Sequence, residues 1–480
     1  MLSRPAVSVE RGRVTRRGPR ARRSILSRPS APRWASIAGV PDLHPVAPLG
    51  AHELLLFLLQ VGLLLLLATL LGRLAARLGM PAIVGELSVG VLLGPSLLAH
   101  LAPGLSEWLL PSRPAQFHLL DATAQIGVLL LVGLTGVQLD FGLVRRRGST
   151  AAKVSVAGFA VPLALGVATG YLLPASLLGE GTDPTVFALF LGVATCVSAI
   201  PVIAKTLRDM NLLHRDVGQL CLTAGTVDDA FGWFMLSIVS AMATTGVRAG
   251  QIALSLLSLA GVVVFALFAG RPLARGVLRA ASRSPGHGPA ITAVVVMVLL
   301  SAAATQALGL EAVLGAFVCG IVIGRSGHAT SEWMAPLHST VIGVLAPLFF
   351  ATAGLRMDLT LLADPAVLAA SGVVLGVAIA GKFAGAYLGA RLSRLSGWEA
   401  LALGAGMNAR GVIEVIVAMV GLRLGVITTE MYTIVIVVAI VTSLMAPPIL
   451  RLAMARVRPT KEEHLRRAFQ DRLVNADQKV

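Results

Sequence analysis

The sequence predicts an all-α polytopic membrane protein with about thirteen transmembrane helices. Of its 480 residues, 56% are hydrophobic and only 13% are charged. The mean hydropathy of +0.82 lies far above that of soluble globular proteins. The apolar residues gather in segments close to the roughly 20 residues that a helix needs to cross a bilayer. Glycine is abundant, with 50 residues, which suits close helix packing in lipid.

The apolar segments follow one another from residue 53 onward. The first is too long for the apolar region of a signal peptide and has no small-residue cleavage site after it, so we interpret it as a retained span. The thirteen predicted spans are 53–72, 82–99, 121–139, 153–174, 184–207, 217–242, 252–270, 288–308, 311–325, 338–357, 366–390, 397–422 and 431–453.

The two ends of the chain are polar. Residues 1–50 are rich in Arg, Ser and Pro without apolar periodicity, which predicts a disordered N-terminal tail. Their composition fits an organelle transit peptide, and it equally fits a start codon assigned too early. Residues 51–453 form the predicted transmembrane domain. Residues 454–480 form a short charged tail, with a helix expected near 461–472.

Basic residues in the loops predict the orientation, because cytoplasmic loops carry an excess of Lys and Arg. The basic residues follow the odd-numbered spans. The loops after these spans (the odd loops) and the C-terminus are therefore expected in the cytoplasm, and the N-terminus outside. The ten Arg of residues 1–33 conflict with this orientation. We expect an integral protein of a bacterial cell membrane. The basic residues are Arg73, Arg77, Arg145–Arg147, Lys205, Arg208, Arg215, Arg271, Arg275, Arg279, Arg325, Arg391, Arg394, Arg451, Arg456 and Arg458.

Two adjacent carboxylates, Asp228 and Asp229, lie inside the apolar span 217–242. An ionised carboxylate at the centre of a bilayer costs roughly 2.5–3.5 kcal/mol on insertion scales, so the pair needs a partner or a function. It either packs helices with the help of a neighbouring cation or binds a cation and protons. Lys382 lies equally deep in the span 366–390 and needs an anion.

Three spans carry residues that interrupt a helix. Broken helices at matching places in two halves of a transporter point to its midplane site. If spans four to six and eleven to thirteen form an inverted repeat, the broken spans five and twelve cross beside the three charged residues. The interrupting residues are Thr195, Ser198 and Pro201 in span five, Pro347 and Gly354 in span ten, and Gly404, Gly406, Asn408, Arg410, Gly411 and Glu414 in span twelve.

Other polar residues have weaker signals. Glu86 is interpreted as a helix-packing or gating residue, Arg410 as an anchor for broken-helix carbonyls or for Glu414, and Glu311 as an interfacial cap. The three cysteines lack metal-ligand spacing, and no Walker or Rossmann pattern occurs. We therefore expect no ATP-driven transport, no enzymatic activity and no cofactor. Because residues 1–33 supply more than half of the net charge of +16, the basic composition does not indicate a nucleic-acid partner.

Seven stretches of the chain form motifs. They are PAIVGELSVGVLLGPSLL (81–98), LLLVGLTGVQLDFGLVRR (129–146), CVSAIPVIAKTL (196–207), TVDDAFGW (226–233), LGAFVCGIVIG (314–324), APLFFATAGLRMDL (346–359), and GKFAGAYLGARL with ALGAGMNARGVIEVIV (381–417). Together they resemble the cation:proton antiporter-2 family, which is related to bacterial Na⁺/H⁺ antiporters, Kef-type systems and plant cation/H⁺ exchangers.

The resemblance implies roles for particular residues. Asp229 is expected to bind the cation, Na⁺ or K⁺, and the proton in alternation, and Asp228 to pair with Lys382. Thr195 and Ser198 are expected to line the helix crossing. Supporting positions are Glu414, Arg410, Asn408 and Glu86. The family pattern also implies a panel or dimerisation part, a mobile core within spans 121–242 and 338–453, elevator-like alternating access and a homodimer.

The chain departs from the family pattern twice. Many plant exchangers have Asn-Asp where this chain has Asp228-Asp229, which leaves ion choice and stoichiometry open. Many bacterial members place the acid of span twelve directly after the glycine, whereas Glu414 stands three residues past Gly411. The role of Glu414 is therefore open.

The expected function is secondary exchange of a monovalent cation for protons by alternating access. Competition of both ions for one carboxylate couples the two fluxes without ATP. If two protons leave per cation, one net charge crosses in each cycle, which is worth about 2.3 kcal/mol per 100 mV. The pair Asp228/Asp229 with Lys382 favours such electrogenic exchange. The alternatives are a ligand-gated K⁺ efflux channel of the Kef type and a non-transporting membrane sensor.

Overall fold

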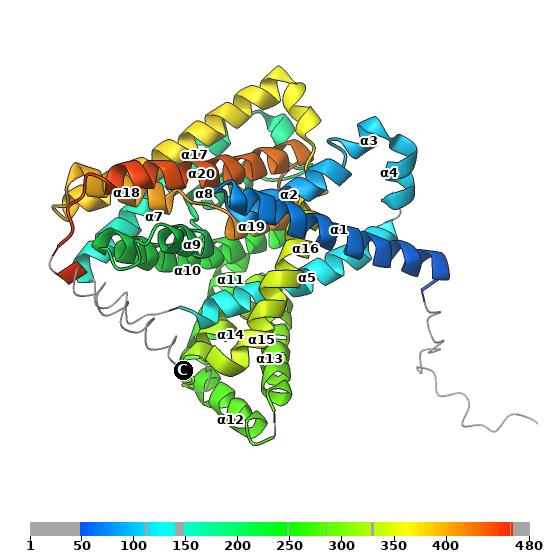
Figure 1. Ribbon diagram of the computed structural model, residues 1–480, viewed down its shortest axis with the longest axis horizontal. Coiled ribbons are helices and arrows are strands. Elements are labelled where there is room, and N and C mark those ends of the chain that lie inside the picture. The colour runs from blue at the N-terminus through cyan, green and yellow to red at the C-terminus, as the bar shows by residue number, and fades with distance from the viewer. Residues whose placement is uncertain are drawn as a thin grey trace, which may run out of the picture. The chain divides into compact units, whose positions relative to one another are not determined.

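In the residues that it describes, the computed structural model consists of helices joined by turns and loops, with one isolated bridge between Leu178 and Ile427. The described residues are 49–110, 114–139, 148–246, 249–284, 286–327, 331–460 and 462–463. The chain divides into a unit of residues 1–50 and a unit of residues 51–480, and the second unit holds the helices (Figure 1). The predicted N-terminal tail up to residue 48, the predicted helix near 461–472 and the basic cluster Arg145–Arg147 lie outside the described residues, apart from Glu462 and Glu463.

Short connections join the helices. The first half of the unit holds α1 (Ala51–Arg77), α2 (Ala82–Leu93), α3 (Leu98–Leu101), α4 (Pro103–Leu109), α5 (Pro114–Val137), α7 (Gly148–Leu172), η2 (Ala175–Leu177), α8 (Pro184–Cys196), α9 (Ile200–Asp209) and α10 (Asp216–Thr245). The second half holds α11 (Ala249–Phe265), η3 (Ala266–Gly270), α12 (Arg271–Ala281), α13 (Gly288–Ala307), α14 (Ala312–Gly324), α15 (Ser331–Thr340), η4 (Val341–Leu345), α16 (Ala346–Gly354), η5 (Leu359–Ala363), α17 (Pro365–Leu392), α18 (Gly397–Met407), α19 (Val412–Arg423) and α20 (Thr429–Met454).

Each of the thirteen predicted spans contains at least one helix. Within the described ranges, nine helices are long and apolar enough to cross a membrane, and α18 with α19 forms a bent pair that passes the same test together. The helices α8 and α14 are apolar but shorter. The polytopic helical fold is therefore confirmed, whereas the number thirteen stays a prediction.

Capping side chains fix the start of several spans. Asp183 before α8 and Asp364 before α17 each accept a backbone N–H of the first turn at 2.7 Å, and each precedes a proline. Because proline has no N–H to leave unsatisfied, it suits the first helical position. The hydrogen bond from Thr185 also holds the pKa of Asp183 below its usual value. Before α18, Ser396 and Glu399 form a reciprocal capping box.

Two of the three predicted interruptions are real breaks. The fifth span stops being helical after Cys196 and resumes at Ile200, and the twelfth bends by 47° between Met407 and Val412. The prediction that the tenth span is interrupted at Pro347 is wrong. There the π-helical turn η4 leads directly into α16. Pro347 has no backbone N–H to donate, and the wider turn before it contains an extra residue, so the helix continues past the proline.

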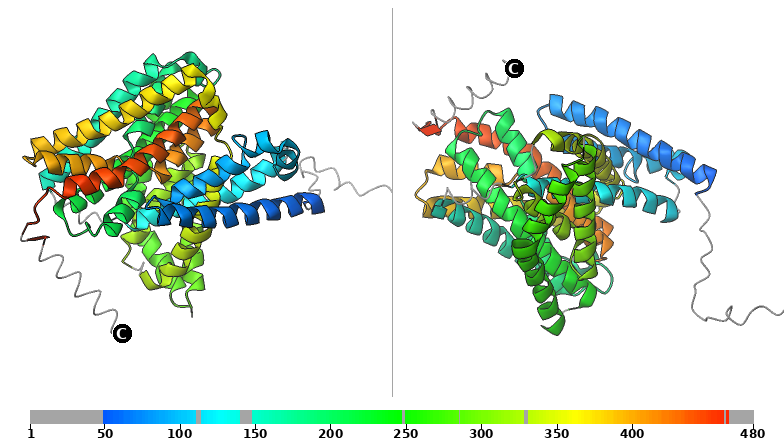
Figure 2. Two further views of the ribbon diagram at one scale, coloured as in Figure 1. Left: turned by 45° about the horizontal axis from the view of Figure 1, so that its top comes forward. Right: turned by 90° about the horizontal axis from the view of Figure 1, so that it is seen from below.

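The helices pack in two groups. In the first, α7 lies against α8, α10 and α17, while α18 contacts α10, α17 and α20. In the second, α5 packs against α14 and α16, and α2 against α1 and α16. Figure 2 shows the first group side by side, with α1 projecting away from it. The helices α5 and α16 fall within the predicted core spans 121–242 and 338–453 but pack chiefly in the second group, so the division into core and panel stays a prediction.

A row of glycines brings α17 against α7. Gly381, Gly385 and Gly389 repeat at intervals of four residues and therefore share one face of α17. A Cβ atom at Gly381 would lie 2.9 Å from the Cα atom of Pro162, and one at Gly389 would lie 2.6 Å from the Cα atom of Val154. Real Cβ atoms do not approach so closely, so the two backbones meet without side chains between them.

Candidate functional site

The two broken helices meet at their breaks. The backbone N–H of Ala199, between α8 and α9, donates to the carbonyl of Ala409, between α18 and α19, at 3.1 Å. The hydroxyl of Ser198 lies 2.8 Å from the carbonyl oxygen of Met407. Broken helices leave backbone groups without intrahelical partners. Here two carbonyl groups of one break accept hydrogen bonds from residues of the other break. The predicted crossing is confirmed.

Asp228 on α10 lies beside this crossing and is paired. Its Oδ2 atom accepts hydrogen bonds from Lys382 Nζ at 2.7 Å and from Ser198 Oγ at 2.9 Å. Lys382 also donates to the carbonyl of Gly158 on α7 at 3.2 Å. The side chains of Asp228 and Lys382 are fully buried. The anion that Lys382 was expected to need is therefore Asp228, and three helices contribute to the pair.

Asp229, the next residue, has no such partner. Its side chain is fully buried, and no side chain donates a hydrogen bond to either carboxylate oxygen. The backbone N–H of Ile200, at the start of α9, is the hydrogen-bond donor that faces this carboxylate. The Oδ1 atom of Asp228 is unpartnered. A buried ionised carboxylate is unstable unless a cation or hydrogen-bond donors compensate it. The carboxylate of Asp229 therefore has less compensation from neighbouring side chains than that of Asp228.

Arg410 joins the two broken helices. Its guanidinium donates to the carbonyls of Ala194 at 2.9 Å and Thr195 at 2.6 Å, which are the last carbonyls of α8. It also donates to the Ala378 carbonyl on α17 and to Glu414 Oε1, both at 3.2 Å. A cation at a helix C-terminus is favoured by the helix dipole. The structure thus places Arg410 as an anchor of both carbonyls and Glu414, as the sequence predicted.

Two other predicted residues lie near the crossing in different situations. The Thr195 hydroxyl lies 3.2 Å from the Pro162 carbonyl on α7 and 3.0 Å from the Gly192 carbonyl of its own helix, so it does not bond to the carboxylates. Asn408 ends α18 and is fully buried, with both amide atoms unpartnered. Its position next to the crossing suits a polar ligand, whereas Thr195 takes part through its backbone.

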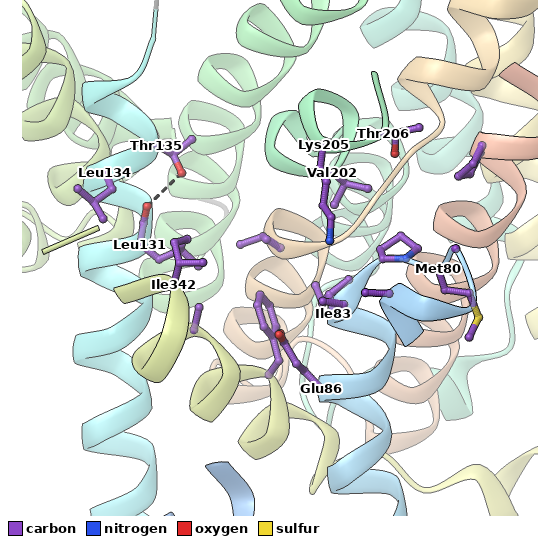
Figure 3. Close-up of a pocket in the computed structure, with 18 of the residues that line it drawn as sticks. Met80, Ile83, Glu86, Leu131, Leu134, Thr135, Val202, Lys205, Thr206 and Ile342 are labelled. Atoms are coloured by element: carbon purple, nitrogen blue, oxygen red, sulfur yellow. Dashed lines mark hydrogen bonds between the residues drawn. The ribbon is translucent and has the colours of Figure 1, made fainter. Parts of the chain in front are cut away.

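Glu86 lies elsewhere. It lines a cavity of about 580 Å³ between α2, α5, α9, α16, α19 and α20, whose lining includes neither Asp228 nor Asp229. Figure 3 shows Glu86 on α2 and Lys205 on α9 on different sides of this cavity. The structure therefore does not bring Glu86 into the charged cluster, and it leaves the gating interpretation open.

Among the ion pairs that sequence reasoning missed, two have almost fully buried acidic partners. Glu311 does not cap α14 with its side chain; instead its Oε2 atom accepts from Arg423 at the end of α19 at 2.7 Å. Glu463 in the C-terminal tail pairs with Arg215 at 3.0 Å. The basic partner of each acid lies more than 100 residues away in the sequence, so the sequence alone does not indicate these pairs. The only available signal is the position of each acid near the end of a predicted span.

Comparisons with known proteins agree with this geometry. A family model described as "Sodium/hydrogen exchanger, transmembrane" matches residues 62–456. The Na⁺/H⁺ antiporter NhaS4 of Synechocystis sp. is 33% identical over 403 residues, which cover 83% of this chain and 97% of that protein. The cation/H⁺ antiporter 17 of Arabidopsis thaliana is 30% identical over 414 residues, and the match spans 85% of this chain but only 49% of the plant protein.

A solved structure shares the fold. The sodium proton antiporter MjNhaP1 of Methanocaldococcus jannaschii superposes with a TM-score of 0.64 at 18% sequence identity, over 84% of this chain and 99% of that one. The broken and crossed helices, the paired charges in the membrane and the family model, which matches most of the chain, lead to one conclusion. The chain belongs to the sodium/hydrogen exchanger family.

Proposed function

We propose that this chain exchanges a monovalent cation, Na⁺ or K⁺, for protons across a membrane, and that the two ions compete for Asp229. The observation that carries the proposal is the buried carboxylate of Asp229, which has no side-chain partner, next to the carboxylate of Asp228, which Lys382 compensates. The relatives named as Na⁺/H⁺ and cation/H⁺ antiporters support the same function.

Charge balance explains how competition couples the fluxes. With a proton or with a cation, the Asp229 carboxylate is compensated, whereas the empty ionised form is costly in the low dielectric of the site. Movement of the site across the membrane is therefore favoured only when one ion is bound. Alternating access then exchanges cation for proton without ATP.

The neighbouring pair makes the exchange electrogenic in this proposal. If Asp228 or Lys382 releases a second proton when the cation binds, two protons cross per cation. The two acids and the lysine titrate as one coupled group, so the protons belong to the group rather than to one residue. Net movement of one charge makes the rate depend on voltage, by about 2.3 kcal/mol per 100 mV.

Purified protein in lipid vesicles tests the function. We expect that adding Na⁺ or K⁺ to vesicles with an acidic interior dissipates the pH gradient, reported by a ΔpH-sensitive dye. The membrane potential is clamped at zero, with Li⁺ compared in parallel. A Kef-type channel would alter ΔpH only through voltage, so it would give no dye response under the clamp. A sensor would give none under any condition.

The orientation is also a proposal: the odd loops and the C-terminus face the cytoplasm of a bacterial cell. A cysteine at Glu180, in the exposed turn after α7, is expected to react with a membrane-impermeant maleimide in intact cells. A cysteine at Ser284, exposed after α12, is expected to react only after permeabilisation. The reverse pattern would invert the orientation. Cys196 and Cys221 are buried and Cys319 is partly buried, so the labelling background is low.

A homodimer is the assembly that we propose, on the basis of the family resemblance. Large apolar side chains are exposed along α1 and α11, including Leu55, Leu58, Leu254 and Leu257. Such surfaces suit contact with lipid or with a second copy.

A further inference from the structure

The chain after α20 returns to the start of α10, the helix that carries Asp228 and Asp229. Arg456 lies over the ring of Trp398 in α18, with 4.2 Å between the guanidinium carbon and the ring centroid. The carbonyl of Val457 then accepts a hydrogen bond from Arg215 Nη2 at 2.8 Å. The end of the last span is thus attached to two helices of the group that surrounds the site.

Glu463 makes the central contact of this attachment. Its Oε1 atom accepts the backbone N–H of Asp216 at 2.6 Å, and its Oε2 atom accepts from Arg215 Nε at 3.0 Å. The Oε2 atom also accepts the backbone N–H of Thr460 at 2.8 Å, which fixes the tail around the carboxylate. Glu463 is only 3% exposed and Arg215 only 9%. This carboxylate is therefore a buried acceptor for three donors.

The contact replaces a cap that α10 lacks. The first backbone N–H groups of a helix have no partners inside the helix, and Arg215, in the capping position, cannot accept with its side chain. Glu463 supplies the acceptor from 247 residues away. Its negative charge also lies at the positive end of the helix dipole. The C-terminal tail thus takes the part that a local Ser or Asp plays in other helices.

The same contact fixes the connection between the broken helix and the carboxylate helix. Residues 210–215 join α9 to α10, and Gln219 in the first turn of α10 donates back to the Leu213 carbonyl at 2.6 Å. Ser198 precedes α9, and Asp228 lies 12 residues into α10, roughly 18 Å along its axis. The relative position of these two helices determines whether Ser198 can reach Asp228.

We propose that Glu463 is a positioning residue for ion exchange: by capping α10 from the C-terminal tail, it holds the carboxylate helix against the broken helix in the geometry that binds the cation. The proposal rests on the proposed role of Asp228 and Asp229, and it assigns to the tail a function that the membrane spans alone do not provide.

The test compares Glu463→Gln with Glu462→Gln in the full-length protein in vesicles. Glu462 is adjacent but exposed, so its variant matches the change in charge without the contact. For Glu463→Gln we expect the KM for Na⁺ or K⁺ to rise roughly five-fold, with the maximal rate per folded protein changed less than two-fold. Glu462→Gln is expected to match the wild type. If Glu463→Gln lowers only the yield or Tm of the protein and leaves KM unchanged, the positioning role is wrong.

A second measurement does not depend on transport. Hydrogen exchange of the amides of residues 216–219 is expected to accelerate in Glu463→Ala and to stay unchanged in Glu462→Ala, because alanine leaves the first turn of α10 without an acceptor from the tail, whereas glutamine would retain its amide oxygen. Unchanged exchange in both variants would overturn the capping contact. If the wild-type protein fails to exchange ions, the proposed function fails, while this measurement still decides whether Glu463 caps α10.

A charge reversal separates capping from simple pairing. The double variant Arg215→Glu/Glu463→Arg restores opposite charges but leaves the Asp216 N–H without an acceptor from the tail. We expect it to keep the raised KM. Full recovery of the wild-type KM would reduce the contact to an ion pair and would contradict the capping role.

Discussion

Replacing Asp229 with asparagine is expected to reduce cation-dependent dissipation of a pH gradient to the background of empty vesicles. Asparagine has nearly the same size, so the packing of α10 is retained, but the amide cannot lose a proton or present a negative charge to a cation. No side chain donates to Asp229, and the amide oxygen of asparagine can still accept the backbone N–H of Ile200, so the change leaves no donor without an acceptor. The protein should therefore remain inserted and elute as a single species in detergent.

The matched control is Glu180→Gln, which neutralises an exposed carboxylate in a loop. It should transport like the wild type. Cation-dependent ΔpH dissipation that persists in Asp229→Asn, in protein confirmed to be folded, would move the transport site away from Asp229. Loss of folded protein would instead show that Asp229 supports the structure, and Asp229→Glu would then test whether restoring a carboxylate restores exchange.

Replacing Lys382 with alanine is expected to cause the largest loss of stability. Lys382 and Asp228 are fully buried and 2.7 Å apart, and removal of one partner leaves an uncompensated charge. Breaking such a buried pair typically costs about 3–5 kcal/mol. The midpoint of thermal unfolding in detergent should fall accordingly. Adding Asp228→Asn should recover part of the loss, because the carboxylate left without a partner becomes neutral.

The two substitutions and their combination form a double-mutant cycle. Strict additivity of the two stability losses would be inconsistent with the direct contact, since residues in contact normally couple. The double variant should also still exchange ions through Asp229 while moving less charge per cycle. Vesicles held at different membrane potentials measure this charge. An unchanged voltage dependence would remove the Asp228–Lys382 pair from the stoichiometry and leave it a structural bridge.

Much of the site follows from the sequence because the membrane makes charges conspicuous. In an apolar span each ionisable side chain needs a partner. The pairing of Asp228 with Lys382 could therefore be predicted from the sequence, although 154 residues separate them. The glycines of span twelve and the proline of span five likewise indicate breaks, since both residue types act on the backbone itself. These predictions depend on local chemistry and need no knowledge of side-chain direction.

Other features could not be predicted because they depend on direction and on distant contacts. The position of Thr195 close to Pro201 in the fifth span predicts that it lies near the crossing. Its hydroxyl donates to the carbonyl of Pro162 because α7 packs against α8, and the sequence does not show this packing. The contact of Glu463 with the start of α10 has no periodic signal in the sequence, because a tail carries no spacing that specifies a partner. Span ten shows a further limit, since a π-helical turn accommodates Pro347 without breaking the helix.

The glycine row between α7 and α17 has a mechanical consequence. Where two backbones touch directly, as at Gly381 and Gly389, no rotatable side chain is present to absorb a displacement. Contacts between the two helix groups involve side chains instead: the Tyr432 hydroxyl on α20 donates to the Ala353 carbonyl on α16, and Trp233 on α10 packs against Phe317 on α14. Such contacts can break and re-form by changes of rotamer. Because Lys382 lies on α17 and also donates to the Gly158 carbonyl on α7, we expect a displacement of either helix to carry the other helix and Lys382 with it.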